Sequence, residues 1–345
     1  MKAIRIGKRL VGPGLPAYLV AEVSANHQQR YETAVEIIRA AAEAGADAVK
    51  LQTYTPDTLT IDCDRPEFRI GGTIWNGRTL HDLYGEAFTP WEWHAGLRAA
   101  AEEVGLDFFS SPFDFSAVDL LEHLGVPAYK IASFELVDLP LIQRVARTGK
   151  PIVLSTGMAS LSEIDDAVEA AKPAGVVLLH CNSGYPAAPS EMNLRTIPFL
   201  AERYGVPVGL SDHTLSPTAA IAAVALGACL IEKHLTLSRA DGGPDAAFSL
   251  EPAEFGDLVR AVRETEASLG GVRTGPTERE QASRLLRRSL FVVKDVAAGE
   301  ILTEANVRSI RPGHGLAPKH LGSVIGRPAA CAISRGEPLR WELVS

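Results

Sequence analysis

Eight short apolar runs between residues 17 and 235 each end in side chains that can bind anions, ligate metals or move protons. The polar ends are Glu22; Lys50 with Gln52; Ser110 with Ser111; Lys130 with Ser133; Ser155; His180 with Asn182; Ser211 with His213; and Glu232 with His234. Apolar runs of this length suit parallel strands buried on both faces. Polar groups gathered at the carboxyl ends of such strands are typical of the catalytic face of a (β/α)₈ barrel.

Two lysines, Lys50 and Lys130, lie inside these apolar runs, where an unpaired ammonium is costly to bury. The alternative, a lysine that extends to solvent along an apolar surface, fits poorly with such neighbours. Side chains of one parity on a barrel strand share the lumen, so Lys50 and Gln52 face one cavity. Hydroxyl groups from neighbouring strand ends complete an expected cradle for a phosphate or carboxylate: Ser110, Ser111, Ser133, Ser155, Ser183 and Ser211.

His213 and His234 end the seventh and eighth expected strands. A lone histidine is more often a hydrogen-bonded core residue, but two imidazoles at adjacent strand ends suit Mn²⁺, Fe²⁺ or Zn²⁺. Glu22 ends the first strand at the same opening, where it could serve as a general base or as a partner of metal-bound water. His180 is interpreted as a packed strand residue.

Helix signals alternate with the strand runs, which is the mark of repeated βαβ units. Thr89-Pro90-Trp91-Glu92 and Ser160-Leu161-Ser162-Glu163 read as capping boxes, and Ser216-Pro217 as a further helix start. A long insertion over 53–88 and a glycine-rich loop over 238–251 interrupt the repeat. A serine-nucleophile elbow, a P-loop and a dinucleotide-binding fingerprint are all absent from the sequence.

The composition is that of a soluble globular protein with a large core, since 46% of the 345 residues are hydrophobic and 22% charged. The net charge of −8 argues against a nucleic-acid surface, which needs a basic patch. No run is long enough to span a membrane, and the first residues lack the apolar core of a signal peptide. Four cysteines without CxxC spacing predict reduced thiols in a cytoplasmic protein, with Cys181 and Cys229 as small buried hydrophobes.

We expect a barrel domain over 1–270, a linker over 271–283 and a small compact domain over 284–345. The segment 270–277 is rich in glycine, with a proline near its end, as is typical of linkers. Short β-rich pieces such as 290–293 follow it, and the remaining length is too short for a second barrel.

At this point the motifs resemble those of the sialic acid synthase family. The segments that carry the resemblance are Ala21-Glu22-Val23-Ser24-Ala25-Asn26-His27, Gly45-Ala46-Asp47-Ala48-Val49-Lys50-Leu51-Gln52 and Leu210-Ser211-Asp212-His213-Thr214. Ile310-Arg311-Pro312-Gly313-His314-Gly315 resembles the antifreeze-like (SAF, β-clip) domain that ends such chains. Within the family, the insertion around Trp75-Asn76-Gly77-Arg78 and Trp91-Glu92-Trp93-His94 looks like the pseudaminic acid synthase branch.

The resemblance implies a transferase that condenses phosphoenolpyruvate with an N-acetylated 6-deoxy aldose, a diacetamido-trideoxy-L-altrose in that branch. The products are a nine-carbon α-keto acid and phosphate. The resemblance further implies that phosphoenolpyruvate is held by Lys50, Gln52, Ser111, Lys130, Ser133, Ser155, Ser183 and Ser211. His213 and His234 would bind a divalent metal, with Mn²⁺ expected and Mg²⁺ or Co²⁺ as alternatives, and Glu22 would act as acid and base.

Sugar contacts implied by the resemblance come from Glu135, Tyr185, Asp245 and Arg311. Arg311 would come from the small domain of a partner subunit, in a domain-swapped homodimer. Asn182 is an alternative to Ser183 at the phosphoenolpyruvate site.

Several alternatives remain at this stage. An N-acetylneuraminate or legionaminic acid synthase would use identical chemistry on another sugar. A Schiff-base aldolase would also need a barrel lysine, although it would not explain the paired histidines. A non-enzymatic carbohydrate- or ice-binding protein built on the small domain would leave the polar strand ends unexplained.

Overall fold

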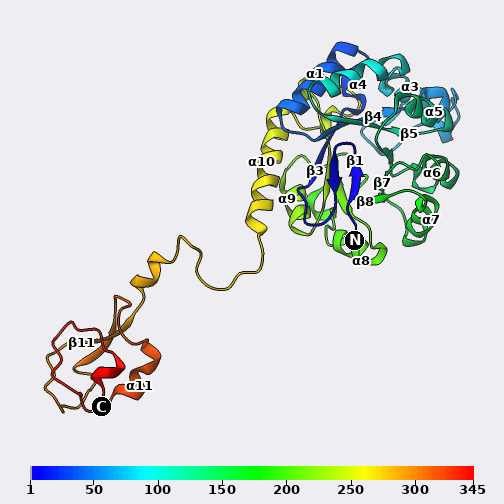
Figure 1. Cartoon of the computed structure of the whole chain (residues 1–345). Helices are drawn as coiled ribbons and strands as arrows, with labels where there is room; N and C mark the ends of the chain where they lie inside the picture. Colours follow the sequence, from blue (N-terminus) through cyan, green and yellow to red (C-terminus); the bar gives the residue numbers. More distant parts are fainter. Residues whose placement is uncertain (1) are drawn as a thin grey trace. The chain divides into compact units, whose positions relative to one another are not determined.

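The computed structural model describes residues 2–345, and the chain forms two compact units, Met1–Gly270 and Gly271–Ser345. Eight parallel strands of the first unit close into a barrel in the order in which they follow one another along the chain (Figure 1). They are β3 (Tyr18–Glu22), β4 (Ala48–Thr53), β5 (Asp107–Pro112), β6 (Tyr129–Ile131), β7 (Ile152–Ser155), β8 (Val176–Cys181), β9 (Val208–Asp212) and β10 (Leu230–His234). The expected (β/α)₈ fold is confirmed.

A helix follows each barrel strand and returns the chain to the other end of the barrel. These helices are α1 (Tyr31–Glu43), α4 (His94–Glu103), α5 (Phe115–Leu124), α6 (Leu139–Ala146), α7 (Leu161–Ala171), α8 (Thr196–Tyr204), α9 (Thr218–Ala225) and α10 (Pro252–Leu269). Two more, α2 (Pro56–Leu59) and α3 (Leu80–Ala87), lie within the insertion after β4. None of the helices over residues 2–345 is both long and apolar enough to cross a membrane.

The period of two along each strand divides the barrel core into two layers. Side chains on one face of each strand pack against the helices in a large apolar cluster. Those on the other face fill the lumen, where Tyr18, Val20, Phe109 and Leu230 form a second apolar cluster at the amino ends of the strands. The hairpin of β1 (Ile4–Ile6) and β2 (Arg9–Val11) adds Ile6 and Val11 to that cluster, so its apolar side chains close this end of the barrel. Apart from Asp107, which accepts a hydrogen bond from the Tyr18 hydroxyl at 2.9 Å, the polar side chains of the lumen lie towards the carboxyl ends.

The helix starts agree with the expected signals in part. Ser160 and Glu163 form the predicted capping box at α7, and Ser216 Oγ accepts a hydrogen bond from Thr218 N at the start of α9. The box expected at Thr89 is wrong, because Thr89 is buried and its hydroxyl instead contacts His27 Nε2 at 3.2 Å. A buried tertiary partner has overridden the local cap here.

The second unit has its own apolar core, in which Leu290, Val292, Leu302 and Leu339 are fully buried. It contains the antiparallel pair β11 (Ser289–Val292) and β12 (Val307–Ile310) and the short helix α11 (Leu321–Val324). A small β-rich domain after the barrel is therefore confirmed, while the division into a linker over 271–283 and a domain over 284–345 stays a prediction.

Candidate active site

Four charged side chains from four strands meet inside the barrel, and we call them the lumen charge network: Glu22, Lys50, Lys130 and Glu232. Lys50 Nζ lies 2.8 Å from Glu22 Oε2 and 3.8 Å from Glu232 Oε2. Lys130 Nζ lies 3.6 Å from Glu232 Oε1. All four residues are at most 4% exposed. The sequence predicted the two lysines and Glu22 at one opening, and the structure brings them together.

Glu232 is the member that the sequence reasoning left out of its candidate site. It shares the parity of His234, so its position in the lumen follows from the strand pattern alone. The structure makes Glu232 the common partner of both lysines. The lysines are therefore paired with protein carboxylates, although we had expected an external anion to pair with them.

Burial and charge act against each other in the lumen charge network. Burial raises the pKa of Glu22 even though Lys50 opposes it, whereas Lys130 and Lys50 outweigh burial and lower the pKa of Glu232. Burial lowers the pKa of Lys130, while Glu22 and Glu232 overcome burial and raise the pKa of Lys50. Nearby charges of opposite sign favour the charged form of each partner. The network thus favours the charged forms of Lys50 and Glu232, while burial disfavours those of Glu22 and Lys130.

Hydrogen-bonding capacity is left over around these charges. Oε2 of Glu232 accepts no hydrogen bond, and the hydroxyl groups of Ser155 and Ser183 are buried without a partner. Buried polar atoms are rarely unpartnered in folded proteins, so each one needs an explanation. A polar ligand in the lumen would supply the missing partners.

The remaining predicted hydroxyls divide between the two faces of the barrel wall. Lys50 Nζ donates to Ser111 Oγ at 3.2 Å, and Ser211 Oγ donates to Glu232 Oε1 at 3.1 Å. Ser110 was expected to join this cradle and does not, because its side chain lies on the helix side, 2.7 Å from Thr53 Oγ1. Adjacent residues of a strand point to opposite faces, so only Ser111 of this pair reaches the lumen.

Gly157, just after β7, lets two of these serines lie close to the backbone of the loop that follows. A Cβ built on Gly157 would lie 2.4 Å from Ser133 Cβ and 3.0 Å from Ser183 Oγ. Gly157 also has a φ of +44°, in the left-handed region that glycine tolerates best. Any larger residue would clash with Ser133 and crowd Ser183, so the glycine supports the positions of both serines.

Asn182 and Ser183 have different surroundings. Asn182 Oδ1 accepts from Gly184 N at 2.7 Å, and its Nδ2 donates to Glu191 O at 3.1 Å. The amide of Asn182 therefore holds the loop after β8. Ser183 Oγ is buried and has no partner.

His213 and His234 stand side by side at the ends of β9 and β10, with ring centroids 5.3 Å apart. His213 Nδ1 is bonded to Asn182 O at 2.8 Å, which orients the ring. Nδ1 of His234 is buried without a hydrogen bond, and burial together with His213 lowers the pKa of His234 well below its ordinary value. A neutral imidazole with a free nitrogen is what a metal ligand requires.

The two imidazoles fit a divalent metal in an open site. Over residues 2–345 no cluster of three or more His, Cys, Asp or Glu side chains could hold a metal ion. Imidazole nitrogens are common ligands of divalent first-row metals, so the two histidines are candidates for two positions of such a site.

Cys181 was interpreted as a small buried hydrophobe, and it is buried as expected, but polar groups of the lumen surround it. Its side chain shares the lumen parity of Leu179, and Ser133 Oγ donates to Cys181 Sγ at 3.4 Å. Although burial opposes it, His213 lowers the pKa of this thiol. Cys229 agrees with the interpretation, since it lies in the apolar cluster at the other end of the lumen. The alternation of side chains along each strand would have predicted that Cys181 and Cys229 have different surroundings.

The predicted sugar contacts line the mouth of the lumen in the first unit. Glu135 Oε2 is buried without a hydrogen-bond partner, and burial raises the pKa of Glu135 to about 7. The ring of Tyr185 lies 4.6 Å from that of His213. Asp245 accepts a hydrogen bond from Ser24 Oγ, which in turn accepts one from Gln52 Nε2 at 2.9 Å.

Ser24 is a second residue that the sequence reasoning named only as part of a motif. It links Asp245 to Gln52, whose Nε2 also donates to Glu22 Oε1 at 3.0 Å. This chain of bonds joins a candidate sugar contact to the lumen charge network. Arg311 lies outside it, exposed directly after β12 in the second unit.

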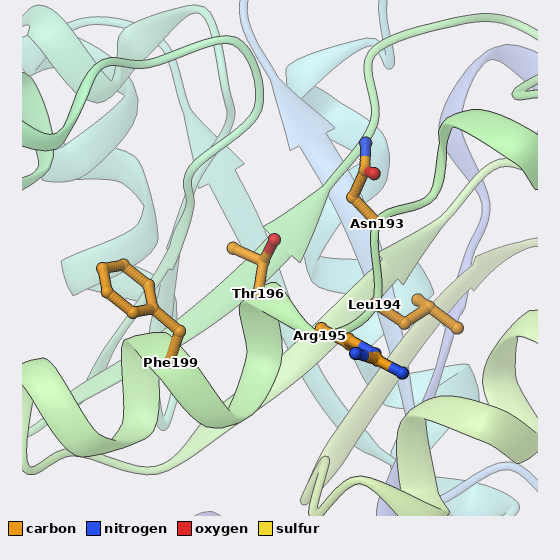
Figure 2. Close-up of a pocket in the computed structure, with 5 residues that line it drawn as sticks. All are labelled: Asn193, Leu194, Arg195, Thr196 and Phe199. Carbon is orange, nitrogen blue, oxygen red and sulfur yellow. The ribbon is translucent and has the colours of Figure 1, made fainter.

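A surface hollow outside the lumen lies at the start of α8. It measures about 600 Å³ and is lined by Asn193, Leu194, Arg195, Thr196 and Phe199 (Figure 2). Arg195 and Phe199 point away from each other in this view. None of the predicted site residues lines the hollow, and the chemistry of this chain is concentrated in the lumen.

Comparison with known proteins places the chain in one family along most of its length. A model of the NeuB family matches residues 37–274, and a SAF domain model matches residues 287–345. The chain is 44% identical to the pseudaminic acid synthase of Helicobacter pylori, over 94% of this chain and 96% of that protein. It is 35% identical to the N,N'-diacetyllegionaminic acid synthase of Legionella pneumophila, over 96% of this chain and 95% of that protein.

A solved structure agrees with this assignment. The N-acetylneuraminic acid synthetase of Leptospira borgpetersenii, crystallised with citrate, superposes with a TM-score of 0.73 at 31% identity. The match covers 82% of this chain and 95% of that one. The suspected resemblance is therefore confirmed: the chain belongs to the NeuB family, the phosphoenolpyruvate-dependent nonulosonic acid synthases, with a SAF domain at its carboxyl end.

Proposed function

We propose that this protein is a pseudaminic acid synthase. It condenses phosphoenolpyruvate with a diacetamido-trideoxy-L-altrose and releases inorganic phosphate. The chemistry is supported by one observation above all, the lumen charge network, in which one carboxylate oxygen of Glu232 and two buried serine hydroxyls have no partner, beside two histidines. The choice of sugar is supported by higher identity to a pseudaminic acid synthase, 44%, than to a legionaminic acid synthase, 35%.

Phosphoenolpyruvate carries a phosphate and a carboxylate, so its site needs cations and hydrogen-bond donors. Lys50 and Lys130 supply the cations, and charge-assisted bonds to them are stronger than neutral ones. Hydrogen-bonding groups complete the site: Gln52, Ser111, Ser133, Ser155, Ser183 and Ser211. We assign Ser183 in preference to Asn182, because only Ser183 has a free buried hydroxyl.

The reaction joins C3 of phosphoenolpyruvate to the aldehyde carbon of the open-chain sugar. Water then adds to C2, and the tetrahedral intermediate loses phosphate by cleavage of the C2–O bond. Glu22 accepts the proton of that water, since it faces the lumen and is positioned by Lys50 and Gln52. Lys50 and Lys130 stabilise the charge that develops on the departing phosphate.

His213 and His234 would hold a divalent metal, for which we propose Mn²⁺, with Mg²⁺ or Co²⁺ as alternatives. When bound, such an ion acts as a Lewis acid that polarises the aldehyde oxygen. Glu135, Tyr185 and Asp245 orient the sugar at the mouth of the lumen. The hydrogen bond from Ser24 Oγ and the buried position of Asp245 fix that carboxyl group in place.

We further propose a cytoplasmic homodimer in which Arg311 of one subunit reaches the acetamido group bound in the other. The two parts of the chain carry opposite charge, which favours association of a small domain with a barrel. Residues 1–270 contain 22 Lys and Arg against 35 Asp and Glu, whereas residues 271–345 contain 12 against 7. Four free cysteines are compatible with a reducing compartment.

The test is a substrate panel with phosphate release as readout, run with Mn²⁺ and with a chelator. We expect phosphate from phosphoenolpyruvate with the diacetamido-trideoxy-altrose, and a large loss with the chelator. Phosphate release with the legionaminic acid precursor or N-acetylmannosamine alone would instead support the second candidate, a synthase of the same chemistry for another sugar. That candidate is favoured by the 35% identity to the Legionella enzyme.

A further inference from the structure

We propose that Trp75, in the insertion after β4, selects a sugar whose C6 is a methyl group. This inference rests on the proposed function and names the residue that recognises the 6-deoxy end of the substrate. Three aromatic rings from three separate segments form what we call the aromatic wall: Trp75, Tyr185 and Phe248. They come from the insertion, from the loop after β8 and from the loop after β10.

The aromatic wall runs without interruption from the two histidines to the insertion. The Phe248 ring, which is 1% exposed, lies 4.9 Å from that of His234 and 6.0 Å from that of His213. Tyr185 lies 4.6 Å from His213 on the same side. The Trp75 ring contacts both, with centroid distances of 5.7 Å to Tyr185 and 6.4 Å to Phe248. Edge-to-face and tilted packing of this kind gives each ring a defined position.

Trp75 is held in place although its neighbours in the insertion are exposed. Its indole Nε1 donates to Pro244 O at 2.8 Å, and Pro244 directly precedes Asp245. The turn that carries it is closed by hydrogen bonds from Ile70 N to Arg78 O and from Gly77 N to Ile70 O, both 2.9 Å. Trp75 and the sugar contact Asp245 are therefore positioned by one segment.

The wall lies where the far end of the sugar must be. The aldehyde carbon is placed at His213 and His234, and five carbon–carbon bonds separate it from C6, a reach of about 6 Å in an extended chain. Tyr185 is one ring contact from His213, and Trp75 is the next. C6 thus falls against the aromatic wall, beside Tyr185 and Trp75.

The indole can offer that carbon only an apolar surface, because its N–H is already donated to Pro244. A methyl group gains by packing on the ring. A hydroxymethyl group would lose its water without finding a partner there, which disfavours it. An apolar pocket discriminates against an added hydroxyl by up to about 100-fold.

The experiment compares kcat/KM for the diacetamido-trideoxy-altrose with that for its counterpart bearing a hydroxyl at C6. We expect the protein to prefer the methyl substrate by about 10- to 100-fold. Trp75→Ala should reduce this preference to about 3-fold or less, whereas Trp75→Phe should keep most of it. The KM for phosphoenolpyruvate should stay within about 2-fold in both variants, because Trp75 contacts none of the residues assigned to that site.

Trp91→Ala is the matched control, since Trp91 also belongs to this region and donates its Nε1 to a carbonyl, that of Tyr54, at 3.1 Å. It lies outside the aromatic wall and should leave the preference unchanged. An unchanged preference in Trp75→Ala, or an equal change in Trp91→Ala, overturns the inference. Turnover of the altrose by the unmodified protein tests the proposed function separately, so the two failures are distinguishable. Trp75→Phe and a thermal melt keep the test valid if Trp75→Ala folds poorly.

Discussion

Strand β10 carries buried charges on both of its faces, and the two sets differ in how fully they are satisfied. On the lumen face, Glu232 meets Lys50 and Lys130, and its Oε2 accepts no hydrogen bond. On the helix face, Lys233 Nζ lies 2.6 Å from Asp212 Oδ2 and also donates to the carbonyl and hydroxyl of Thr214. We call this second set the wall ion pair, Lys233 with Asp212.

The wall ion pair is complete in itself. All three protons of the Lys233 ammonium have acceptors, and Asp212 Oδ1 accepts from Thr214 N at 2.9 Å. Because the bonds go to the residues on either side of His213, the pair also fixes the turn that carries that histidine. Burial of charge therefore does not by itself mark a catalytic site. Unsatisfied hydrogen-bonding capacity, present in the lumen and absent from the wall, separates the two.

Removal of Lys233 should have the largest effect on folding. Lys233→Met leaves Asp212 buried without its partner, so the free energy of unfolding should fall by about 3–5 kcal/mol. Urea unfolding followed by circular dichroism measures this change. The double variant Lys233→Met with Asp212→Leu should recover most of the loss, because it removes both charges. A loss below about 1 kcal/mol in Lys233→Met would contradict a wall pair that acts as a closed structural unit.

The same substitution in the lumen should affect catalysis more than folding. Lys130→Met removes a cation opposite the substrate, and kcat/KM should fall by about 10²–10³-fold, the usual effect of losing one stabilising group. The fold should survive, since Lys50 still pairs with both carboxylates. Phosphate release and thermal melting, measured side by side, separate the two effects. Equal losses of stability in Lys130→Met and Lys233→Met would erase the distinction between the two faces.

Acid should weaken the outer part of the barrel through two buried histidines. Burial lowers the pKa of His27 and of His94 to about 4, while an unfolded histidine titrates near 6.5. Between about pH 6.5 and 4 the unfolded chain binds more protons, so each histidine should reduce the free energy of unfolding by about 1.4 kcal/mol per pH unit as the pH falls. Its contribution is fully present above pH 6.5.

Urea unfolding at several pH values between 7.5 and 4.5 measures this slope. Glutamine does not titrate in this range, so His94→Gln should reduce the slope of the free energy of unfolding against pH by the contribution of one histidine. The stability of the unmodified protein should be independent of these histidines above about pH 7. A slope unchanged by His94→Gln would place the acid sensitivity in other groups, such as the lumen carboxylates.

The smallest effect is expected at an ion pair exposed to solvent. Lys172 Nζ lies 2.9 Å from Glu169 Oε2 at the carboxyl end of α7, and the two side chains are 71% and 72% exposed. Lys172→Ala should change the free energy of unfolding by less than about 0.5 kcal/mol, because solvent and salt screen the pair. This variant serves as the solvent-exposed control for the lumen charge network and for the wall ion pair. A change comparable to that of Lys233→Met would mean that burial does not control these energies.

Much of the site followed from position along the strands. The rule that alternate residues share a face placed Lys50 with Gln52, and Ser211 with His213. The same rule, applied consistently, would have moved Ser110 out of the lumen and brought Cys181 and Glu232 into it. The error at Thr89 is of another kind, since a local cap competes there with a contact to His27, 62 residues away. No local pattern contains that information.

The sequence by itself determined the barrel, the order of its strands and the end at which its chemistry gathers. These follow from local apolar periodicity and from the fact that parallel strands bring their carboxyl ends together. Only the tertiary structure decided which charges are satisfied and which remain free, how Ser24 connects Asp245 to Gln52, and where Trp75 meets Tyr185 and Phe248. Hydrogen-bond partners and ring contacts depend on distances between segments far apart in the chain, and these distances are fixed only when the barrel closes.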